Sequence, residues 1–213
     1  MIRFVTFEGG DGTGKTTQIQ AAEKYLREQN RACVVTREPG GTALGQLIRK
    51  VLVEVGDHEI APATELFLYL ADRAQHVNQI IRPAIDAGKI VLCDRFTDST
   101  LVYQGYGRGI ELDWVRRLND TASEGLRPDL TFLFDCPVDV GQTRTALRQA
   151  QAAADGSPED RFEREEIQFH EKVRRGFLEV ARGDPERFRI IDAARSVSEV
   201  TEQIREILDR ELL

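Results

Sequence analysis

The sequence predicts an α/β fold with a five-stranded parallel sheet and helices on both faces. Five short apolar runs alternate with segments of helix length along the 213 residues, and such alternation is typical of parallel strands joined by helices. Apart from the first run, which partly alternates, the runs are nearly continuous in apolar residues, as strands buried on both faces are. Without an internal repeat or an interdomain linker, the chain is expected to form one domain over residues 1–213.

The expected elements follow one another in a regular order. The apolar runs that predict strands span residues 2–8, 32–36, 89–94, 130–135 and 188–192. The segments that predict helices span residues 15–29, 43–55, 64–88, 111–123, 139–154, 160–182 and 197–213. Pro83 lies inside the third helical segment. Because proline lacks an N–H donor and clashes with the preceding turn, it is expected to kink or split that helix.

The composition argues against several classes of protein. The formal net charge of −7 disfavours a sequence-independent nucleic-acid binder, since such proteins neutralise phosphates with a basic face. No apolar run approaches the ~20 residues that span a bilayer, and the N-terminus lacks a signal-peptide pattern. Cys33, Cys93 and Cys136 do not have the spacing of a zinc or redox motif. We therefore expect a cytoplasmic protein with reduced thiols and with neither a membrane nor a nucleic-acid partner.

The glycine loop GGDGTGKT, residues 9–16, matches the pattern G-x-x-x-x-G-K-[ST]. Its backbone N–H groups and the positive end of the following helix form a cradle for phosphates, to which Lys15 adds a full charge. The hydroxyl of Thr16 is placed to ligate Mg²⁺. The loop predicts a nucleoside triphosphate binder, but GTPases, motor ATPases, sulfotransferase-like enzymes and small-molecule kinases share it. No Asn-Lys dipeptide occurs in the chain, which disfavours a GTP switch, and a motor ATPase would need a longer chain.

Two predicted strands end in a carboxylate, Asp94 in IVLCD and Asp135 in TFLFD. Either could support Mg²⁺ through water. Asp94 is preferred because Arg95 follows it, and the carboxyl edge of an open α/β sheet is where ligands bind. Asp135, which Cys-Pro follows, is interpreted as half of an ion pair that closes the strand end.

Further arginines are expected at the same edge. In the helix TELFLYLADRAQHV, Arg73 lies within an apolar stripe, with Tyr69 one turn before it. An arginine there either snorkels or pairs with a nearby acid, or else meets a ligand whose planar ring stacks on Tyr69. Arg37 follows the second strand and is either a solvated turn residue or a third cation. Convergence of Arg37, Arg73 and Arg95 would indicate a second phosphate-bearing ligand, which fits a kinase of a nucleoside monophosphate.

A polar segment with small residues, QAQAAADGSPE at 149–159, separates two helical segments. It is either a surface loop or a mobile lid, and four arginines flank it: Arg144, Arg148, Arg161 and Arg164.

Four motifs resemble the successive signatures of bacterial thymidylate kinase: FEGGDGTGKTTQ, TREPGGT, the helix ADRAQH, and DRFTDSTLVYQGYGRG. The match is collinear from Phe4 to Arg108, and DRFE at residues 160–163 continues it. The resemblance implies a P-loop kinase fold that pairs as a homodimer. It further implies ATP-dependent, Mg²⁺-requiring phosphorylation of dTMP to dTDP, which supplies dTTP for DNA synthesis.

The resemblance assigns the donor site to the phosphate loop. By analogy, Lys15 holds the ATP phosphates, while Thr16 and Asp94 hold the metal, and Lys15, Asp94 and Arg95 belong to the catalytic set. The residues implied for ATP binding are Gly9, Gly10, Asp11, Gly12, Thr13, Gly14, Lys15, Thr16, Thr17 and Arg161.

For the acceptor, the resemblance implies that Asp11 bonds the 3′-hydroxyl of dTMP and that Arg37 and Arg95 hold its phosphate. Arg73 would read the thymine edge. The remaining residues implied for the thymine and deoxyribose pocket are Tyr69, Ser99, Thr100, Tyr103 and Gln104. Tyr69 stands where the family usually stacks a phenylalanine on the base, so its hydroxyl needs a partner or an open edge.

Gly12 stands where some family members place an arginine, and those members lack a basic lid. The chain resembles the other type, in which a lid, here about residues 144–165, supplies the arginine that offsets developing charge during transfer. Arg148 is expected to have this role, with Arg161 assisting. Two alternatives stay open: a kinase for another nucleoside monophosphate or a deoxynucleoside, and a non-catalytic nucleotide-binding regulator.

Overall fold

The computed structural model describes residues 2–53, 59–154 and 161–212, without the side chains of 151–154, 163 and 164. In this part of the chain, five strands form one parallel sheet in the order β2-β3-β1-β4-β5. The strands are β1 Phe4–Gly9, β2 Cys33–Arg37, β3 Ile90–Asp94, β4 Leu130–Asp135 and β5 Phe188–Asp192. The predicted fold class is confirmed, and each strand lies within two residues of its predicted bounds.

The burial of the strands follows their place in the sheet. The central strands β1, β3 and β4 are buried along almost their whole length. The edge strands β2 and β5 are half-exposed, with Val35 39% and Ile190 49% accessible. The expectation that these two runs are buried on both faces was therefore wrong, because an edge strand has a neighbour on one side only.

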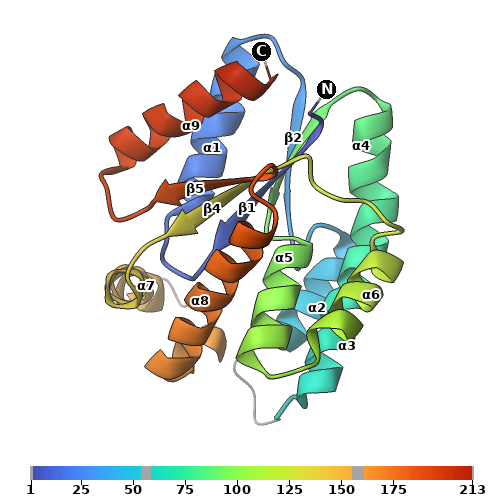
Figure 1. The fold of residues 1–213 in the computed structure, drawn as a ribbon, viewed down its shortest axis with the longest axis vertical. Coiled ribbons are helices and arrows are strands. Elements are labelled where there is room, and N and C mark those ends of the chain that lie inside the picture. Colours follow the sequence, from blue (N-terminus) through green and yellow to red (C-terminus); the bar gives the residue numbers. More distant parts are fainter. Residues whose placement is uncertain (1, 54–58, 155–160, 213) are drawn as a thin grey trace.

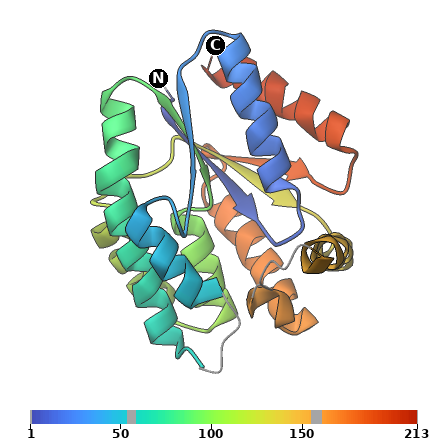
Figure 2. The ribbon, with the colours of Figure 1, turned by 180° about the vertical axis from the view of Figure 1, so that it is seen from behind.

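The helices lie in two layers, one on each face of the sheet (Figures 1 and 2). The α-helices are α1 Lys15–Glu28, α2 Ala43–Val53, α3 Pro62–His76, α4 Arg82–Asp86, α5 Thr97–Thr100, α6 Leu112–Ala122, α7 Val138–Ala154, α8 Ile167–Gly183 and α9 Val197–Leu212. Helices α1 and α9 pack against Val5 and Phe7 of β1. On the other face, α4 and the π-helical segment Val77–Ile81 before it cover Phe4, and α8 covers Leu133 of β4.

Three helical segments differ from the prediction. The third predicted helix is divided by a π-helical segment, Val77–Ile81, directly before α4, in which Pro83 takes an N-terminal position that needs no N–H donor. Residues 160–182 contain a 3₁₀ turn, Arg161–Arg164, before α8. The helical stretch of α5 and the π-helical Leu101–Gly107 was not predicted. The ends of the second and last predicted helices, residue 160 and residues 155–159 of the polar segment lie outside the described residues.

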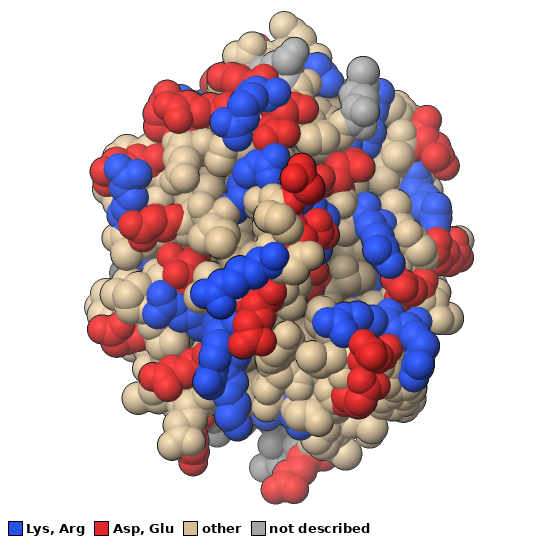
Figure 3. Space-filling view, in the orientation of Figure 1, with Lys and Arg blue, Asp and Glu red and all other residues tan. Residues whose placement is uncertain are grey.

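No helix in the described ranges combines the length and apolar character that crossing a bilayer requires. On the face drawn in Figure 3, basic and acidic side chains are interspersed.

Candidate active site

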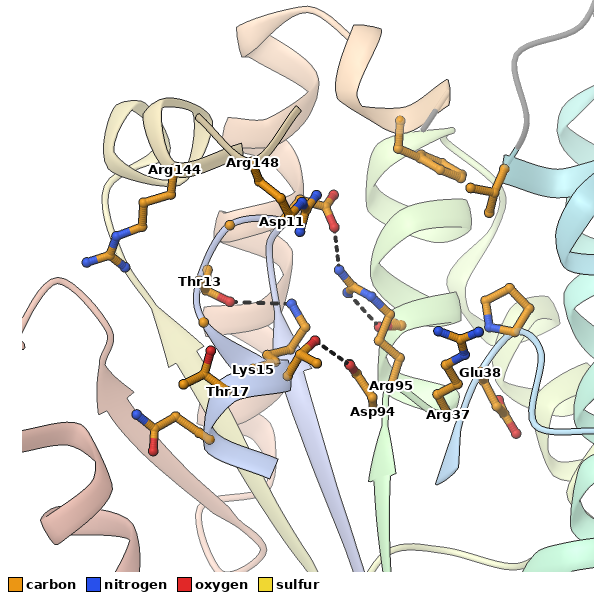
Figure 4. Close-up of a pocket in the computed structure, with 18 of the residues that line it drawn as sticks. Asp11, Thr13, Lys15, Thr17, Arg37, Glu38, Asp94, Arg95, Arg144 and Arg148 are labelled. Carbon is orange, nitrogen blue, oxygen red and sulfur yellow. Dashed lines mark hydrogen bonds and ion pairs between the residues drawn. The ribbon is translucent and has the colours of Figure 1, made fainter. Parts of the chain in front are cut away.

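The phosphate loop joins β1 to α1, as its sequence predicts (Figure 4). Gly9 has φ +135°, and a Cβ atom there would lie 2.4 Å from the carbonyl oxygen of Phe134. Gly12 has φ +72°, and its Cβ would lie 2.1 Å from the carbonyl oxygen of Gly141 in α7. Both positions therefore require glycine, for the backbone angle and for the space. The first turn of α1 has no acidic side chain, so its positive end faces the loop without compensation.

Lys15 lies folded over the loop. Its ammonium group donates to the carbonyl oxygens of Gly9 at 3.1 Å and Gly10 at 2.7 Å, and to the hydroxyl of Thr13 at 3.3 Å. Burial, followed by the charge of Arg95, lowers the pKa of Lys15 from 10.5 to about 8. Negative charge added next to Lys15 would offset the burial and the neighbouring cation and would raise this pKa again.

Thr16 and Asp94 meet at the predicted metal position. The hydroxyl of Thr16 donates to Oδ2 of Asp94 at 3.3 Å, although the residues are 78 positions apart. The pairing of β1 with β3, which aligns Phe7 with Asp94, brings the two together. Asp135 instead accepts two hydrogen bonds from Arg174, at 2.7 and 2.9 Å. The interpretation of Asp135 as half of an ion pair is therefore confirmed.

Arg95 is held beside the phosphate loop. Its Nη2 donates to Asp11 at 2.7 Å, and its guanidinium lies 5.1 Å from the centre of the Tyr103 ring. The hydroxyl of Tyr103 also donates to Asp11, at 3.1 Å. Burial by itself would raise the pKa of Asp11, but Arg95, Lys15 and the Tyr103 hydroxyl together lower it below its usual value. Asp11 is therefore ionised and accepts hydrogen bonds.

Arg73 is 1% exposed and pairs with an acid, as one of the two alternatives for it stated. Its Nη2 lies 2.7 Å from Oε2 of Glu38, the residue after Arg37. It also donates to Oδ1 of Asn119 at 2.6 Å and to Oγ1 of Thr100 at 3.0 Å. Glu38 in turn contacts His76, 2.9 Å away. Arg73 also lines the cavity that lies between the phosphate loop and α3, so the pairing fixes its side chain at the cavity wall.

One large cavity, of about 1430 Å³, connects these groups. It extends from the phosphate loop to the end of β2, to α3 and α5, and to the turn between β5 and α9. The predicted residues that line it are Asp11, Gly12, Thr13, Gly14, Lys15, Thr16, Thr17, Arg37, Tyr69, Arg73, Asp94, Arg95, Ser99, Thr100, Tyr103, Gln104 and Arg148. The structure thus brings together Arg37, Arg73 and Arg95, as convergence at one sheet edge predicts.

The lid arginines take different places. Arg148 of α7 lines the cavity and points toward Asp11 (Figure 4). Arg144 donates to the carbonyl oxygen of Ala193 at 2.7 Å, near β5. Arg161 lies with the acceptor side instead: it donates to Glu65 at 2.7 Å and to the carbonyl oxygen of Leu52 at 3.1 Å. In this conformation Arg161 is therefore apart from the phosphate loop.

Sequence reasoning missed three residues near the cavity. Glu38 orients Arg73, and its signals in the sequence were its place next to Arg37 and within the motif TREPGGT. Glu65 of α3 is fully buried and accepts from Gln104 at 2.8 Å. Phe162 lines the cavity, with its ring centre 5.5 Å from that of Tyr103. Their roles depend on contacts between distant segments, which no local pattern reports.

The chain is similar to known proteins over nearly its full length. The family model described as thymidylate kinase matches residues 7–204. The thymidylate kinase of Geobacter sulfurreducens is 51% identical over 205 residues, covering 96% of this chain and 95% of that protein. That of Desulfovibrio desulfuricans is 50% identical over 206 residues, covering 97% and 94%. A crystal structure of thymidylate kinase from Ehrlichia chaffeensis has a TM-score of 0.77 and 34% identity, covering 97% of this chain and 98% of that one.

These similarities extend over nearly the full chain and agree with the P-loop kinase architecture of the sheet. From them we conclude that the chain belongs to the thymidylate kinase family.

Proposed function

We propose that the chain catalyses phosphorylation of dTMP by ATP to give dTDP and ADP, and thereby supplies dTTP for DNA synthesis. The observation that carries the proposal is the single cavity that joins a phosphate loop to three converging arginines, Arg37, Arg73 and Arg95. The loop accounts for one phosphate-bearing ligand, and the arginines account for a second. The family to which the chain belongs supports the choice of dTMP and ATP as those ligands.

On the donor side, the loop amides, the positive end of α1 and Lys15 bind the triphosphate. Lys15 turns from the carbonyl oxygens of the loop toward the phosphates, where added negative charge stabilises its ammonium form. The sugar and adenine extend toward Ala193, Arg195 and Ser196, which line the far end of the cavity.

On the acceptor side, Arg37 and Arg95 bind the phosphate of dTMP, and ionised Asp11 accepts a hydrogen bond from the 3′-hydroxyl. Arg73, held by Glu38, donates to the thymine edge. Tyr69 stacks on the base, and the ring of Tyr103 closes the sugar pocket. Ser99, Thr100 and Gln104 line the rest of this pocket.

The transfer breaks the bond between the γ-phosphorus and the oxygen that leaves with ADP, and forms a bond from the same phosphorus to a phosphate oxygen of dTMP. The protein contributes position and charge rather than a covalent intermediate. Arg95 and Lys15 hold the reacting phosphates in line, and Arg148 offsets the charge that develops between them. Closure of α7 over the site excludes water, which would otherwise accept the phosphoryl group.

Mg²⁺ belongs to the proposal, and the residues present suit it. The hydroxyl of Thr16 and the carboxylate of Asp94 are hard oxygen donors. Within the described residues there is no group of three or more His, Cys, Asp or Glu side chains that could hold a metal. This agrees with an ion held by one or two protein oxygens together with phosphates and water. The ion, when bound, would neutralise charge on the transferring phosphates.

A homodimer also belongs to the proposal. Helix α2 presents three exposed apolar side chains at helical spacing: Leu44 (48% accessible), Leu47 (61%) and Val51 (45%). Phe67 on the adjoining α3 is 51% accessible. A second copy of the chain would cover this apolar face.

A cytoplasmic location completes the proposal. Cys33, Cys93 and Cys136 are free thiols, as expected where disulfides do not persist. The nucleotides used in DNA synthesis are found in the same compartment.

An acceptor panel tests the proposed activity. Purified protein is incubated with ATP, Mg²⁺ and dTMP, dUMP, dGMP or thymidine, and the products are separated by ion-exchange chromatography. We expect dTMP to have the highest kcat/KM. A preference for another acceptor would favour one of the other kinase activities, and binding of ATP and dTMP without formation of dTDP would favour a regulator.

A further inference from the structure

We propose that Glu8 is a positioning residue of the acceptor site. Its buried carboxyl group holds the backbone at Phe96 and the hydroxyl of Ser99, and thereby fixes the guanidinium group of Arg95 where the acceptor phosphate binds. The proposal rests on the function proposed above, because Arg95 has a phosphate to bind only if the chain takes a nucleoside monophosphate.

The first contact concerns the backbone. Arg95 has φ +67°, a left-handed conformation that side chains other than glycine rarely adopt. Hydrogen bonds hold it on both sides. The N–H of Arg95 donates to the carbonyl oxygen of Phe7 at 3.0 Å, and the N–H of Phe96 donates to Oε1 of Glu8 at 2.7 Å. Glu8 therefore anchors the residue that follows the unusual backbone angle, and this angle turns the Arg95 side chain toward the phosphate loop.

The second contact concerns the side chain. The hydroxyl of Ser99 donates to Oε2 of Glu8 at 2.5 Å, and Nη1 of Arg95 donates to the same hydroxyl at 3.2 Å. When Glu8 is ionised, Ser99 gives its proton to this carboxylate, and the lone pairs of the hydroxyl face the arginine. Nη1 of Arg95 also donates to the carbonyl oxygen of Gly9 at 2.8 Å, one residue beyond Glu8. The carboxyl group of Glu8 thus fixes Arg95 in two ways, through the backbone at Phe96 and through the Ser99 hydroxyl that contacts the guanidinium group.

The surroundings of Glu8 argue against the alternative that it is only half of a structural ion pair. Glu8 is fully buried, and burial together with the nearby charge of Asp98 raises its pKa to about 8. Asp98 has its own partner, since Arg187 donates to its two oxygens at 2.6 and 3.0 Å. The contacts of Glu8 are to the neutral groups of Phe96 and Ser99. Burial of a carboxyl group costs free energy. We infer that this cost is offset because Glu8 fixes the geometry of residues 95–99.

The decisive measurement is how much the acceptor phosphate contributes to binding. Dissociation constants for dTMP and for thymidine are measured by calorimetry at pH 9, where most Glu8 side chains, with a pKa of about 8, are ionised. The ratio of the dissociation constant for dTMP to that for thymidine reports the contacts made by the phosphate. In Glu8→Gln, the amide oxygen still accepts from Phe96, but the amide N–H₂ no longer accepts the Ser99 proton. We expect dTMP to bind about tenfold more weakly, as for loss of one charge-assisted contact, while thymidine binding changes less than about twofold.

Thr6→Val is the matched control. Thr6 lies on the same strand and the same face as Glu8, is equally buried, and bonds the hydroxyl of Thr131 at 2.8 Å. This variant also loses a buried hydrogen bond in β1, so it reports the effect of loosening the strand. We expect it to retain the wild-type ratio. Ser99→Ala removes the link between Glu8 and Arg95 without a change in β1, and we expect it to raise the ratio of the dissociation constant for dTMP to that for thymidine, as Glu8→Gln does.

A double variant shows whether Glu8 acts through Arg95. If it does, Glu8→Gln added to Arg95→Ala causes no further loss of dTMP affinity. Full additivity would overturn the proposal, as would equal weakening of dTMP and thymidine or no change in either. Failure of the proposed function looks different: wild-type protein would then bind dTMP no better than thymidine, and Arg95 would have no acceptor phosphate to be positioned for.

Discussion

The charge of Lys15 depends on whether the phosphate loop is filled. Its pKa of about 8 means that, in the protein alone, about half of the molecules lack the Lys15 proton at pH 8. The negative charge of a triphosphate raises this pKa again. We therefore expect ATP binding to take up protons at pH 8 and to take up markedly fewer at pH 6.5, where Lys15 is already charged. Titration calorimetry in two buffers with different ionisation enthalpies measures the uptake.

Lys15→Met is the control for proton uptake, since the nucleotide itself also titrates near neutral pH. The difference between wild type and this variant isolates the contribution of Lys15. Equal uptake by both proteins at pH 8 would contradict the assignment.

Glu8 makes the stability depend on pH. Its pKa is about 8 in the folded protein and 4.5 as the ordinary value, so between these values the folded state binds a proton that the unfolded state has released. The free energy of unfolding therefore falls as pH rises through this window, by about 1 kcal/mol for each pH unit. Asp72, with a pKa of about 6, contributes in the lower part. We expect urea unfolding between pH 6.5 and 7.5 to show the slope in wild type and a smaller slope in Glu8→Gln.

For single residues, the sequence predicted which side chains lie at the site better than it predicted which side chains contact one another. For Arg73, the two alternatives were an acidic partner or a ligand. In the structure Arg73 pairs with an acid, Glu38, and this pairing holds the arginine at the cavity wall. The partner could not be chosen from the sequence because it lies 35 residues away. The direction in which the Glu38 side chain points depends on the turn after β2.

Among the elements, helix α7 packs its backbone directly against the backbone of the phosphate loop. A Cβ atom at Gly141 would lie 2.7 Å from the carbonyl oxygen of Asp11. We expect Gly141→Ala to displace the loop backbone and raise KM for ATP about tenfold. Gly183→Ala at the end of α8, where a Cβ meets nothing within 4 Å, should leave KM for ATP unchanged. Steady-state kinetics measure both, and an unaltered KM in Gly141→Ala would show that the loop adjusts freely.

The same contact explains why the arginine that offsets developing charge is expected in the lid. With α7 in this position, the Cβ of any residue at position 12 would collide with the carbonyl oxygen of Gly141, 2.1 Å away. An arginine at that position would require α7 to move.

The lid arginines should differ in their effect on turnover. Arg148 lines the cavity, so Arg148→Ala should lower kcat by about 100-fold or more and leave the dissociation constant for dTMP nearly intact. Arg161 pairs with Glu65, so Arg161→Ala should lower kcat less than about tenfold. Single-turnover kinetics and calorimetry measure the two quantities. Unchanged turnover in Arg148→Ala would remove that residue from the mechanism.

Whether an element could be predicted depended on what its residues face. The strands and long helices were predicted because an apolar core imposes a period on them. Residues 97–107 have no such period, since Ser99, Thr100, Tyr103 and Gln104 face the cavity instead. Their helical form is set by tertiary contacts such as that between Gln104 and Glu65.

For the whole molecule, the exposed face of α2 determines the expected assembly. Leu47 is its most accessible member, at 61%. A buried leucine replaced by a charge disrupts an interface, so we expect Leu47→Glu to be a monomer when wild type is a dimer. Leu147→Glu on α7, at an equally accessible leucine (63%), should remain a dimer. Sedimentation velocity distinguishes these states, and an unchanged sedimentation coefficient in Leu47→Glu would place the interface elsewhere.

The order of the sheet has a consequence for engineering. Arg37 ends β2 at one edge, and Ala193 follows β5 at the opposite edge, with three strands between them. The phosphate loop, on the central strand, is the part that both nucleotides share. Substitutions at the two edges are far apart and should act independently. Donor preference, from the β5–α9 turn, and acceptor preference, from α3 and the end of β2, can therefore be redesigned separately and then combined in one chain.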